Sequence, residues 1–177
     1  IGPRGTGKGF VSRLIHDARS GQDEEFKFFD CREFKGKNSS LRTLSISFQS
    51  TILKTLVFKS PHLLQLDVQE RLARCIASRR MMLKKPFTYL PNFKFIALFP
   101  LPMERLIREG LLLKNLASCF SGYPIIVPSL NERGHAVLRW ADKILIQESE
   151  AQNKRVKGFS PDAQSAMLYH PWTGNIS

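Results

Sequence analysis

The first residues of the chain have the composition and spacing of a phosphate-binding loop. The sequence "IGPRGTGKGF" places glycines at Gly2, Gly5 and Gly7, followed by Lys8 and Gly9. In such a loop the glycines let backbone N–H groups face phosphate oxygens, and the lysine neutralises the outer phosphates. A helix that follows the loop adds the positive end of its dipole. The position after the lysine usually carries a hydroxyl group that binds magnesium, and here it is a glycine.

Periodic apolar residues predict the elements that must position this loop. Strands are expected within 24–34, 51–60, 92–100 and 124–130, and helices within 8–20, 66–80, 102–110, 135–152 and 160–170. The first helix should bury a face made of Phe10, Val11, Leu14 and Ile15. The last helix should begin at the N-cap Ser160 with a proline at its first position.

Strands that alternate with helices indicate a parallel sheet with helices on both faces. The fold class is therefore α/β. We expect a core domain over residues 1–133, which lacks the start of its first strand. A small, truncated helical subdomain over 134–177 should follow, because two helices and no strand are predicted there.

The 177-residue chain has a formal net charge of +12, which favours phosphate-bearing partners. The basic residues form small clusters, "KNSSLR", "SRRMMLKK" and "NKRVKG", each more typical of a solvated surface than of a DNA-reading motif. The apolar runs are too short to cross a membrane, and no signal peptide is recognised. Three widely spaced cysteines fit reduced thiols. We expect a cytoplasmic protein without a membrane partner.

Several segments, in order, resemble the AAA+ domain of bacterial sigma-54-dependent transcriptional activators, the NtrC-like enhancer-binding proteins. "GTGKGFVSRLIH" is similar to the family's Walker A segment GTGKELVARAIH, and "FKFFDC" to its strand ending in Asn-Cys. "LDVQERLARCI", "MERLIREG" and "YPIIVPSLNER" resemble the helix after Walker B, the helix after sensor I and the strand ending in PPLRER. "KGFSPDAQSAMLYHPWTGNIS" resembles the lid ending in YPWPGNVR. The resemblance implies a P-loop NTPase fold with a three-layer core and a helical lid.

The residues that bind magnesium and activate water in this family are replaced. Its Walker B sequence TLFLDEI aligns with "TLVFKSP", so the magnesium-binding aspartate falls on Lys59 and the catalytic glutamate on Ser60. A lysine cannot bind a cation, and a serine is too weak a base to activate water at neutral pH. We expect this strand to lie beside the strand of the phosphate-binding loop, with Lys59 directed toward the phosphates.

Other functional positions of the family are also changed. The sensor I asparagine falls on Pro100, and two arginines that reach a neighbour's phosphate fall on Leu111 and Leu113. The sensor II arginine falls on Ser177. The sigma-contacting GAFTGA motif has no counterpart between Cys31 and Thr55.

These replacements predict a nucleotide-binding domain without ATPase activity, in which no residue is catalytic and none binds a metal. The nucleotide, ATP or ADP, should bind weakly and without magnesium. The contacting residues are expected to be Gly2, Pro3, Arg4, Gly5, Thr6, Gly7, Lys8, Gly9 and Phe10. A vestigial loop that binds nothing is the competing interpretation.

The resemblance implies a bacterial transcription regulator that has lost its ATPase and its sigma-54 contact. Its expected partners are DNA, through a C-terminal domain outside this chain, RNA polymerase, and further copies of itself. Two alternatives remain. One is an active ATPase activator of sigma-54 RNA polymerase, with Asp67 as the nearest acid after the Walker B strand. The other is a non-functional gene fragment, because the chain starts and stops inside motifs.

Overall fold

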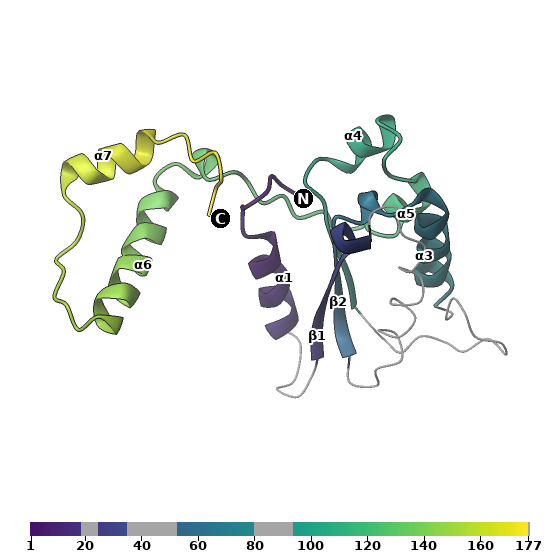
Figure 1. Cartoon of the computed structure of the whole chain (residues 1–177), viewed down its shortest axis with the longest axis horizontal. Helices are drawn as coiled ribbons and strands as arrows, with labels where there is room; N and C mark the ends of the chain where they lie inside the picture. Colours follow the sequence, from purple (N-terminus) through teal and green to yellow (C-terminus); the bar gives the residue numbers. More distant parts are fainter. Residues whose placement is uncertain (19–24, 35–52, 80–93, 177) are drawn as a thin grey trace. The chain divides into compact units, whose positions relative to one another are not determined.

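The computed structural model describes residues 1–18, 25–34, 53–79 and 94–176 (Figure 1). Their contacts define two compact units. The first consists of Ile1–Gly2 and Gly7–Ile126, and the second of Pro3–Thr6 and Val127–Ser177. The chain therefore passes through the second unit within its first seven residues and returns to it after Ile126, seven residues before the boundary expected at 133.

The first unit is built on a parallel sheet. Its strands are β1 (Glu25–Asp30), β2 (Leu53–Lys59) and β3 (Lys94–Leu98), in the spatial order β1-β2-β3. Asp30 lies opposite Lys59, which in turn lies opposite Leu98, so the carboxyl ends of the strands are level. The predicted parallel sheet is confirmed, and β2 is the central one of its described strands.

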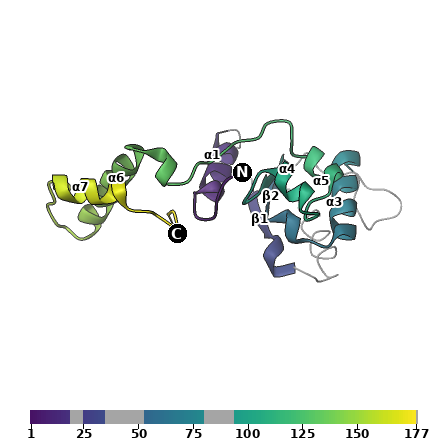
Figure 2. The ribbon, with the colours of Figure 1, turned by 90° about the horizontal axis from the view of Figure 1, so that it is seen from above.

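Helices cover both faces of this sheet, as Figures 1 and 2 show. On one face lies α1 (Lys8–Asp17), where Nδ1 of His16 and Oγ1 of Thr55 are 2.9 Å apart. The opposite face packs against α3 (Leu66–Ser78), α4 (Met103–Arg108) and α5 (Lys114–Ser118). Sheet and helices form the expected three layers of a P-loop NTPase fold.

The hydrophobic core lies between the sheet and the second layer of helices. Its fully buried side chains include Leu56, Phe58, Leu72, Leu106 and Leu116. Each buried leucine or phenylalanine stabilises the fold by about 1.5–3 kcal/mol relative to its exposed state. On α3 the side chains of Val68, Leu72 and Cys75 are buried in this core, and that of Ile76 is partly buried against it.

The predicted buried face of α1 is wrong at two of its four positions, since Val11 and Ile15 are partly buried. Phe10 and Leu14 are about half exposed, whereas Ser12 and His16 are buried. These two polar side chains tolerate burial because both are hydrogen-bonded: Ser12 Oγ donates to the Gly9 carbonyl, and His16 pairs with the sheet. The periodicity of the apolar residues therefore failed to predict that Ser12 and His16 lie on the buried face of α1.

The strand predicted over 124–130 is also not found, and these residues have an irregular backbone. The carbonyl of Ile125 accepts a hydrogen bond from the backbone nitrogen of Ile1 at 2.7 Å. A strand needs a continuous ladder of such bonds to a neighbour, and one bond does not make a ladder.

Two short 3₁₀ helices follow β1 and β2, and a third precedes the α-helices of the second unit. They are η1 (Cys31–Phe34), η2 (Pro61–Leu63) and η3 (Asn131–Arg133). The second unit continues with α6 (Ala136–Ala151) and α7 (Pro161–Tyr169). The predicted cap of α7 is confirmed, because the N–H of Ala163 donates to Ser160 Oγ at 3.2 Å.

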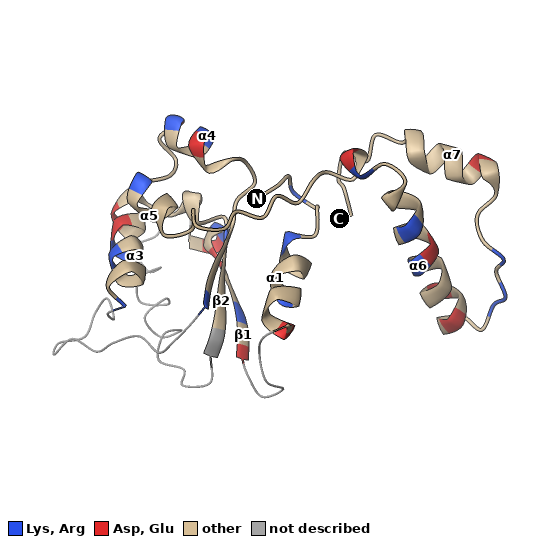
Figure 3. Cartoon of the chain, turned by 180° about the vertical axis from the view of Figure 1, so that it is seen from behind, with Lys and Arg blue, Asp and Glu red and all other residues tan. Residues whose placement is uncertain are grey.

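No helix within the described part of the chain is long and apolar enough to span a membrane. Among the basic clusters, the one after α6 is described, and its residues Lys154, Arg155 and Lys157 are exposed. Figure 3 shows basic segments in the connection between α6 and α7. The cluster "KNSSLR" and most of "SRRMMLKK" lie outside the described residues, as does most of the stretch where GAFTGA would fall.

Candidate nucleotide site

The first unit contains both ends of the phosphate-binding loop. The N–H of Gly2 donates to the carbonyl of Phe99 at 3.1 Å. Phe99 directly follows β3, so Gly2 lies next to β3, and β3 separates it from β2. The expectation that the Walker B-like strand is the neighbour of the loop strand is therefore wrong. β2, the Walker B-like strand, lies between β1 and β3 and not at a remote edge of the sheet, as expected.

The loop turns into α1 at Gly7, which is the N-cap of that helix and has a left-handed φ of 86°. This conformation suits glycine because a side chain would be strained there. Lys8 follows as the first helical residue, and its ammonium group donates to the carbonyl of Gly2. Partial burial lowers the pKa of Lys8. Phe10 is exposed on the same helical turn.

The middle of the loop, Pro3–Thr6, belongs to the second unit. Thr6 is buried, and its hydroxyl donates to the carbonyl of Pro3 at 2.9 Å. The carbonyls of Arg4 and Gly5 accept hydrogen bonds from Asn175 and Ile176, and that of Thr6 accepts one from Arg133. All nine predicted site residues are described, and they divide between the two units.

The carboxyl end of β2 carries a cation above an aromatic ring. Nζ of Lys59 lies 4.2 Å from the centroid of the Phe28 ring, which suits a cation–π interaction. The same ring lies beside α1, because a Cβ atom added to Gly9 would meet it at 3.5 Å. Lys59 thus lies on the α1 side of the sheet. A lysine and a phenylalanine ring here offer no oxygen to a metal ion.

The residue after Lys59 turns the chain away from the sheet. Ser60 has a left-handed φ of 55°, its N–H donates to the Leu98 carbonyl at 3.0 Å, and its carbonyl accepts from the N–H of Leu63. Its backbone is therefore fixed by β3 and by η2. This turn determines where any side chain at position 60 can point.

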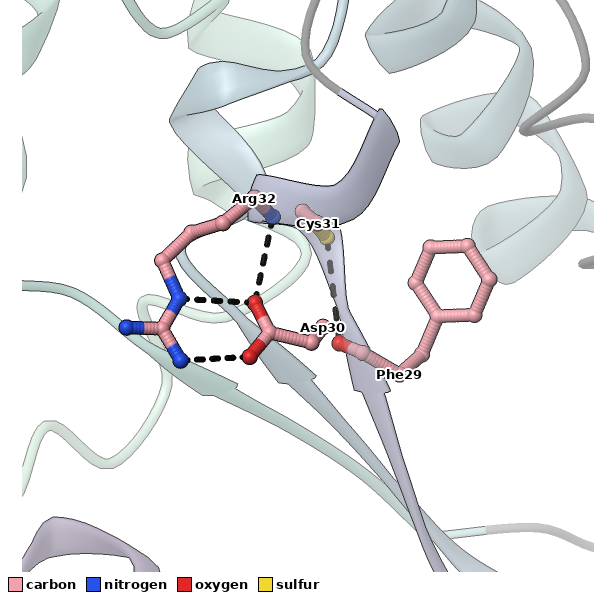
Figure 4. A network of polar contacts seen from close by, with 4 residues as sticks. All are labelled: Phe29, Asp30, Cys31 and Arg32. Carbon is pink, nitrogen blue, oxygen red and sulfur yellow. Dashed lines mark hydrogen bonds and ion pairs between the residues drawn. The ribbon is translucent and has the colours of Figure 1, made fainter.

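Asp30 is an acid at this end of the sheet that sequence reasoning missed. Its carboxylate is bound by Arg32, whose backbone N–H and Nε donate to Oδ1 at 3.1 and 2.9 Å, while NH2 donates to Oδ2 (Figure 4). These hydrogen bonds lower the pKa of Asp30, with a smaller contribution from the charge of Lys59. The signal available in the sequence was its place at the end of a predicted strand.

The side chain of Gln69 joins α3 to the loop that contains Leu111 and Leu113, the positions of the replaced arginines. Gln69 Nε2 donates to the carbonyls of Leu64 and Leu111, both at 2.9 Å, and Gln69 Oε1 accepts from the N–H of Leu113 at 3.0 Å. Leu111 is exposed, and Leu113 packs against the core. Ser177, at the sensor II position, lies outside the described residues. No group of three or more histidine, cysteine or acidic residues among those described could hold a metal.

No known protein-family model matches the chain, but individual relatives do. It is 24% identical over 191 residues to the alginate biosynthesis transcriptional regulatory protein AlgB of Pseudomonas syringae pv. tomato, covering 99% of this chain and 43% of that protein. It is 23% identical over 190 residues to the DNA-binding transcriptional regulator NtrC of Rhizobium meliloti, covering 99% of this chain and 39% of that protein. The chain thus spans about two fifths of the length of these relatives.

The fold is shared with a solved structure. NtrX from Brucella abortus in complex with ATP superposes with a TM-score of 0.77 at 20% sequence identity, over 99% of this chain and 43% of that chain. The structure and this similarity agree on the α/β P-loop fold predicted from the sequence.

Proposed function

Because the chain is a relative of the bacterial sigma-54-dependent transcription regulators and has their AAA+ fold, we propose that it is a nucleotide-binding domain without ATPase activity. Backbone amides of the loop and Lys8 contact the phosphates of ATP or ADP. The bound nucleotide acts as a ligand of a regulatory domain and is not turned over. The separation of residues 1–133 as core and 134–177 as lid belongs to this proposal.

The observation that carries the proposal is the arrangement of Lys59, Phe28 and Gly9. A hydrolytic site of this fold needs a metal ion beside the phosphates and a base that activates water. Here the position of the metal-binding acid is a lysine held over an aromatic ring, and that ring adjoins the residue that lacks a hydroxyl. Lys59, Phe28 and Gly9 therefore offer magnesium no ligand, and the carboxylate of the neighbouring Asp30 is already bound by Arg32. The ammonium group of Lys59 offers a positive charge in place of the metal.

An active ATPase is the second candidate, because the structure places Asp30 next to Lys59 in the sheet. Its carboxylate already accepts three hydrogen bonds from Arg32. A carboxylate neutralised in this way, with a lowered pKa, is a poor base. Release of phosphate from ATP that Asp30→Asn abolishes would establish this alternative and refute the proposal.

The partners of the whole regulator follow from its relatives. One of them is described as a DNA-binding transcriptional regulator, and we propose that the longer protein containing this domain binds DNA through a C-terminal domain and acts on RNA polymerase in the cytoplasm. Leucines at positions 111 and 113 remove the arginines that would bridge subunits through nucleotide. Any homo-oligomer would therefore form without that bridge.

Binding of nucleotide tests the proposal directly. We expect ATP and ADP to bind the chain weakly, with nearly the same affinity in magnesium and in a chelator, because Lys59 and Gly9 stand at the positions expected to hold the metal. Removing the ammonium group with Lys8→Ala should weaken binding about tenfold or more, since a hydrogen bond to a charged group contributes about 1.5–3 kcal/mol. Titration of a fluorescent ATP analogue measures both effects.

The matched control is Lys154→Ala, which removes an exposed lysine from the loop after α6 and should leave the affinity unchanged. Tight binding that disappears in the chelator would show a functional metal site and contradict the proposal. No binding at millimolar nucleotide would leave the loop a vestige.

A further inference from the structure

The middle of the phosphate-binding loop is held by a turn close to the other end of the chain. Asn175 Nδ2 donates to the carbonyl of Arg4 at 2.8 Å, and the N–H of Ile176 donates to the carbonyl of Gly5 at 3.0 Å. NH2 of Arg133 donates to the carbonyl of Thr6. Three consecutive carbonyls of the loop are thus bound by donors of the second unit.

The residues that supply these donors are themselves fixed. Asn175 Oδ1 accepts from the N–H of Leu130 at 2.7 Å, and its own N–H donates to the carbonyl of Trp172 at 2.8 Å. Its left-handed φ of 56° is one that asparagine tolerates better than most residues. Arg133 is held by the carbonyl of Pro128, which accepts from Nε at 3.3 Å and from NH2 at 3.1 Å.

Fixing a carbonyl also fixes the amide that follows it. In a planar trans peptide the C=O of one residue and the N–H of the next point in opposite directions. The bonds to the carbonyls of Arg4, Gly5 and Thr6 therefore direct the N–H groups of Gly5, Thr6 and Gly7 away from the donors. Successive N–H groups turned to one side form an anion-binding concavity.

We propose that Asn175 and Arg133 are positioning residues, which hold the loop amides of Gly5, Thr6 and Gly7 in the orientation that binds phosphate. They do so from behind the loop, through its carbonyls, and need no contact with the ligand. This inference rests on the proposed nucleotide binding. It assigns a function to the turn containing Asn175 that does not depend on a sensor arginine.

The consequence is that the affinity for phosphate depends on Asn175. Without its bond to Arg4 the loop samples other conformations, and the apparent dissociation constant rises in inverse proportion to the competent fraction. If that fraction falls to about a tenth, binding weakens about tenfold. We expect Asn175→Ala to lose about this factor in affinity for ATP and for inorganic pyrophosphate, and Arg133→Gln to lose at least as much.

The experiment combines this titration with ¹⁵N relaxation of the nucleotide-free chain. Amides of Gly5, Thr6 and Gly7 should have order parameters near the rigid value of about 0.85, falling below about 0.6 in either variant. Asn131→Ala is the matched control, because its Nδ2 donates at 2.7 Å to the carbonyl of Pro171 and not to the loop. This control should change neither the order parameters nor the affinity.

Unchanged order parameters in both variants would overturn the proposal, and so would unchanged affinity in a chain that binds ATP. If the unaltered chain binds no ATP, the proposed function fails, while the relaxation data still decide whether Asn175 and Arg133 hold the loop. Arg133→Gln provides the answer if Asn175→Ala does not fold. The melting temperature of each variant separates local loosening from global unfolding.

Discussion

At the scale of single residues, the end of β2 shows how several side chains together set the chemistry of one position. Lys59 stands where the resemblance to the sigma-54-dependent activators places an acid, and its surroundings suit a cation: the centroid of the Phe28 ring lies 4.2 Å from its ammonium group. Gly9, beside that ring, supplies no hydroxyl. The chemistry at the end of β2 therefore depends on three residues from different elements: Lys59 of β2, Phe28 of β1 and Gly9 of α1.

The double substitution Lys59→Asp with Ser60→Glu should not produce ATP turnover. The new aspartate would adjoin an apolar ring, and the remaining positions, Pro100, Leu111 and Leu113, would still lack the groups that stabilise the transition state. Release of inorganic phosphate, with and without magnesium, is the measurement. Lys27→Asp, an exposed position on β1, is the control for the change in charge. Turnover by the double variant above that control would show that the two acids suffice.

At the scale of elements, Gln69 joins α3 to the segments on both sides of it. Its side chain is fully buried, and its amide connects the carbonyls of Leu64 and Leu111 with the N–H of Leu113. Buried polar groups of this kind stabilise a fold only while all their bonds are made. The loop before α5 is held by this side chain together with the hydrogen bonds from the N–H groups of Leu111 and Leu112 to the Leu106 carbonyl.

Replacing Gln69 with leucine should lower the free energy of unfolding by about 2 kcal/mol or more, because each buried group left without a partner costs about 1–3 kcal/mol. Denaturant unfolding measures the change. Gln164→Leu is the control, since this exposed glutamine donates to a single carbonyl, that of Phe159, and its loss should cost less than about 0.5 kcal/mol. A loss at Gln69 no larger than this would mean that the amide network contributes nothing.

At the scale of the whole molecule, stability should depend on the protonation of His62. This residue is 8% exposed, its ring is close to that of Phe99, and its Nδ1 has no hydrogen-bond partner among the described residues. Burial lowers the pKa of His62 below its ordinary value of 6.5. His62 therefore takes up a proton at a lower pH in the folded chain than in the unfolded chain.

The contribution of His62 to stability is complete above pH 6.5 and declines as the pH falls below that value. We expect the free energy of unfolding of the unaltered chain to fall more steeply below this pH than that of His62→Leu, by at most about 1.4 kcal/mol per pH unit. Denaturation at a series of pH values tests this. His135→Gln, which changes an exposed histidine, should follow the unaltered chain. Equal slopes for the unaltered chain and His62→Leu would contradict the prediction.

Much of the architecture could be predicted because its signals are local. The strands β1, β2 and β3, the helix α3 and the cap of α7 follow from the order of apolar residues and from one N-cap serine. Errors arose where tertiary contacts outweighed periodicity. Ser12 and His16 are buried in α1 because their hydrogen bonds are satisfied, and the segment 124–130 has no strand ladder.

By itself, the sequence determined the fold class, the spacing of the phosphate-binding loop and the presence of Lys59 and Ser60 at the end of a strand, since these depend on residue type and near neighbours. Only the tertiary structure decided which strand adjoins Gly2, that Arg32 neutralises Asp30, and that Asn175 holds the carbonyl of Arg4. Arg4 and Asn175 are 171 positions apart in the sequence. Hydrogen bonds across such separations depend on how the chain folds back on itself, and no local pattern encodes them.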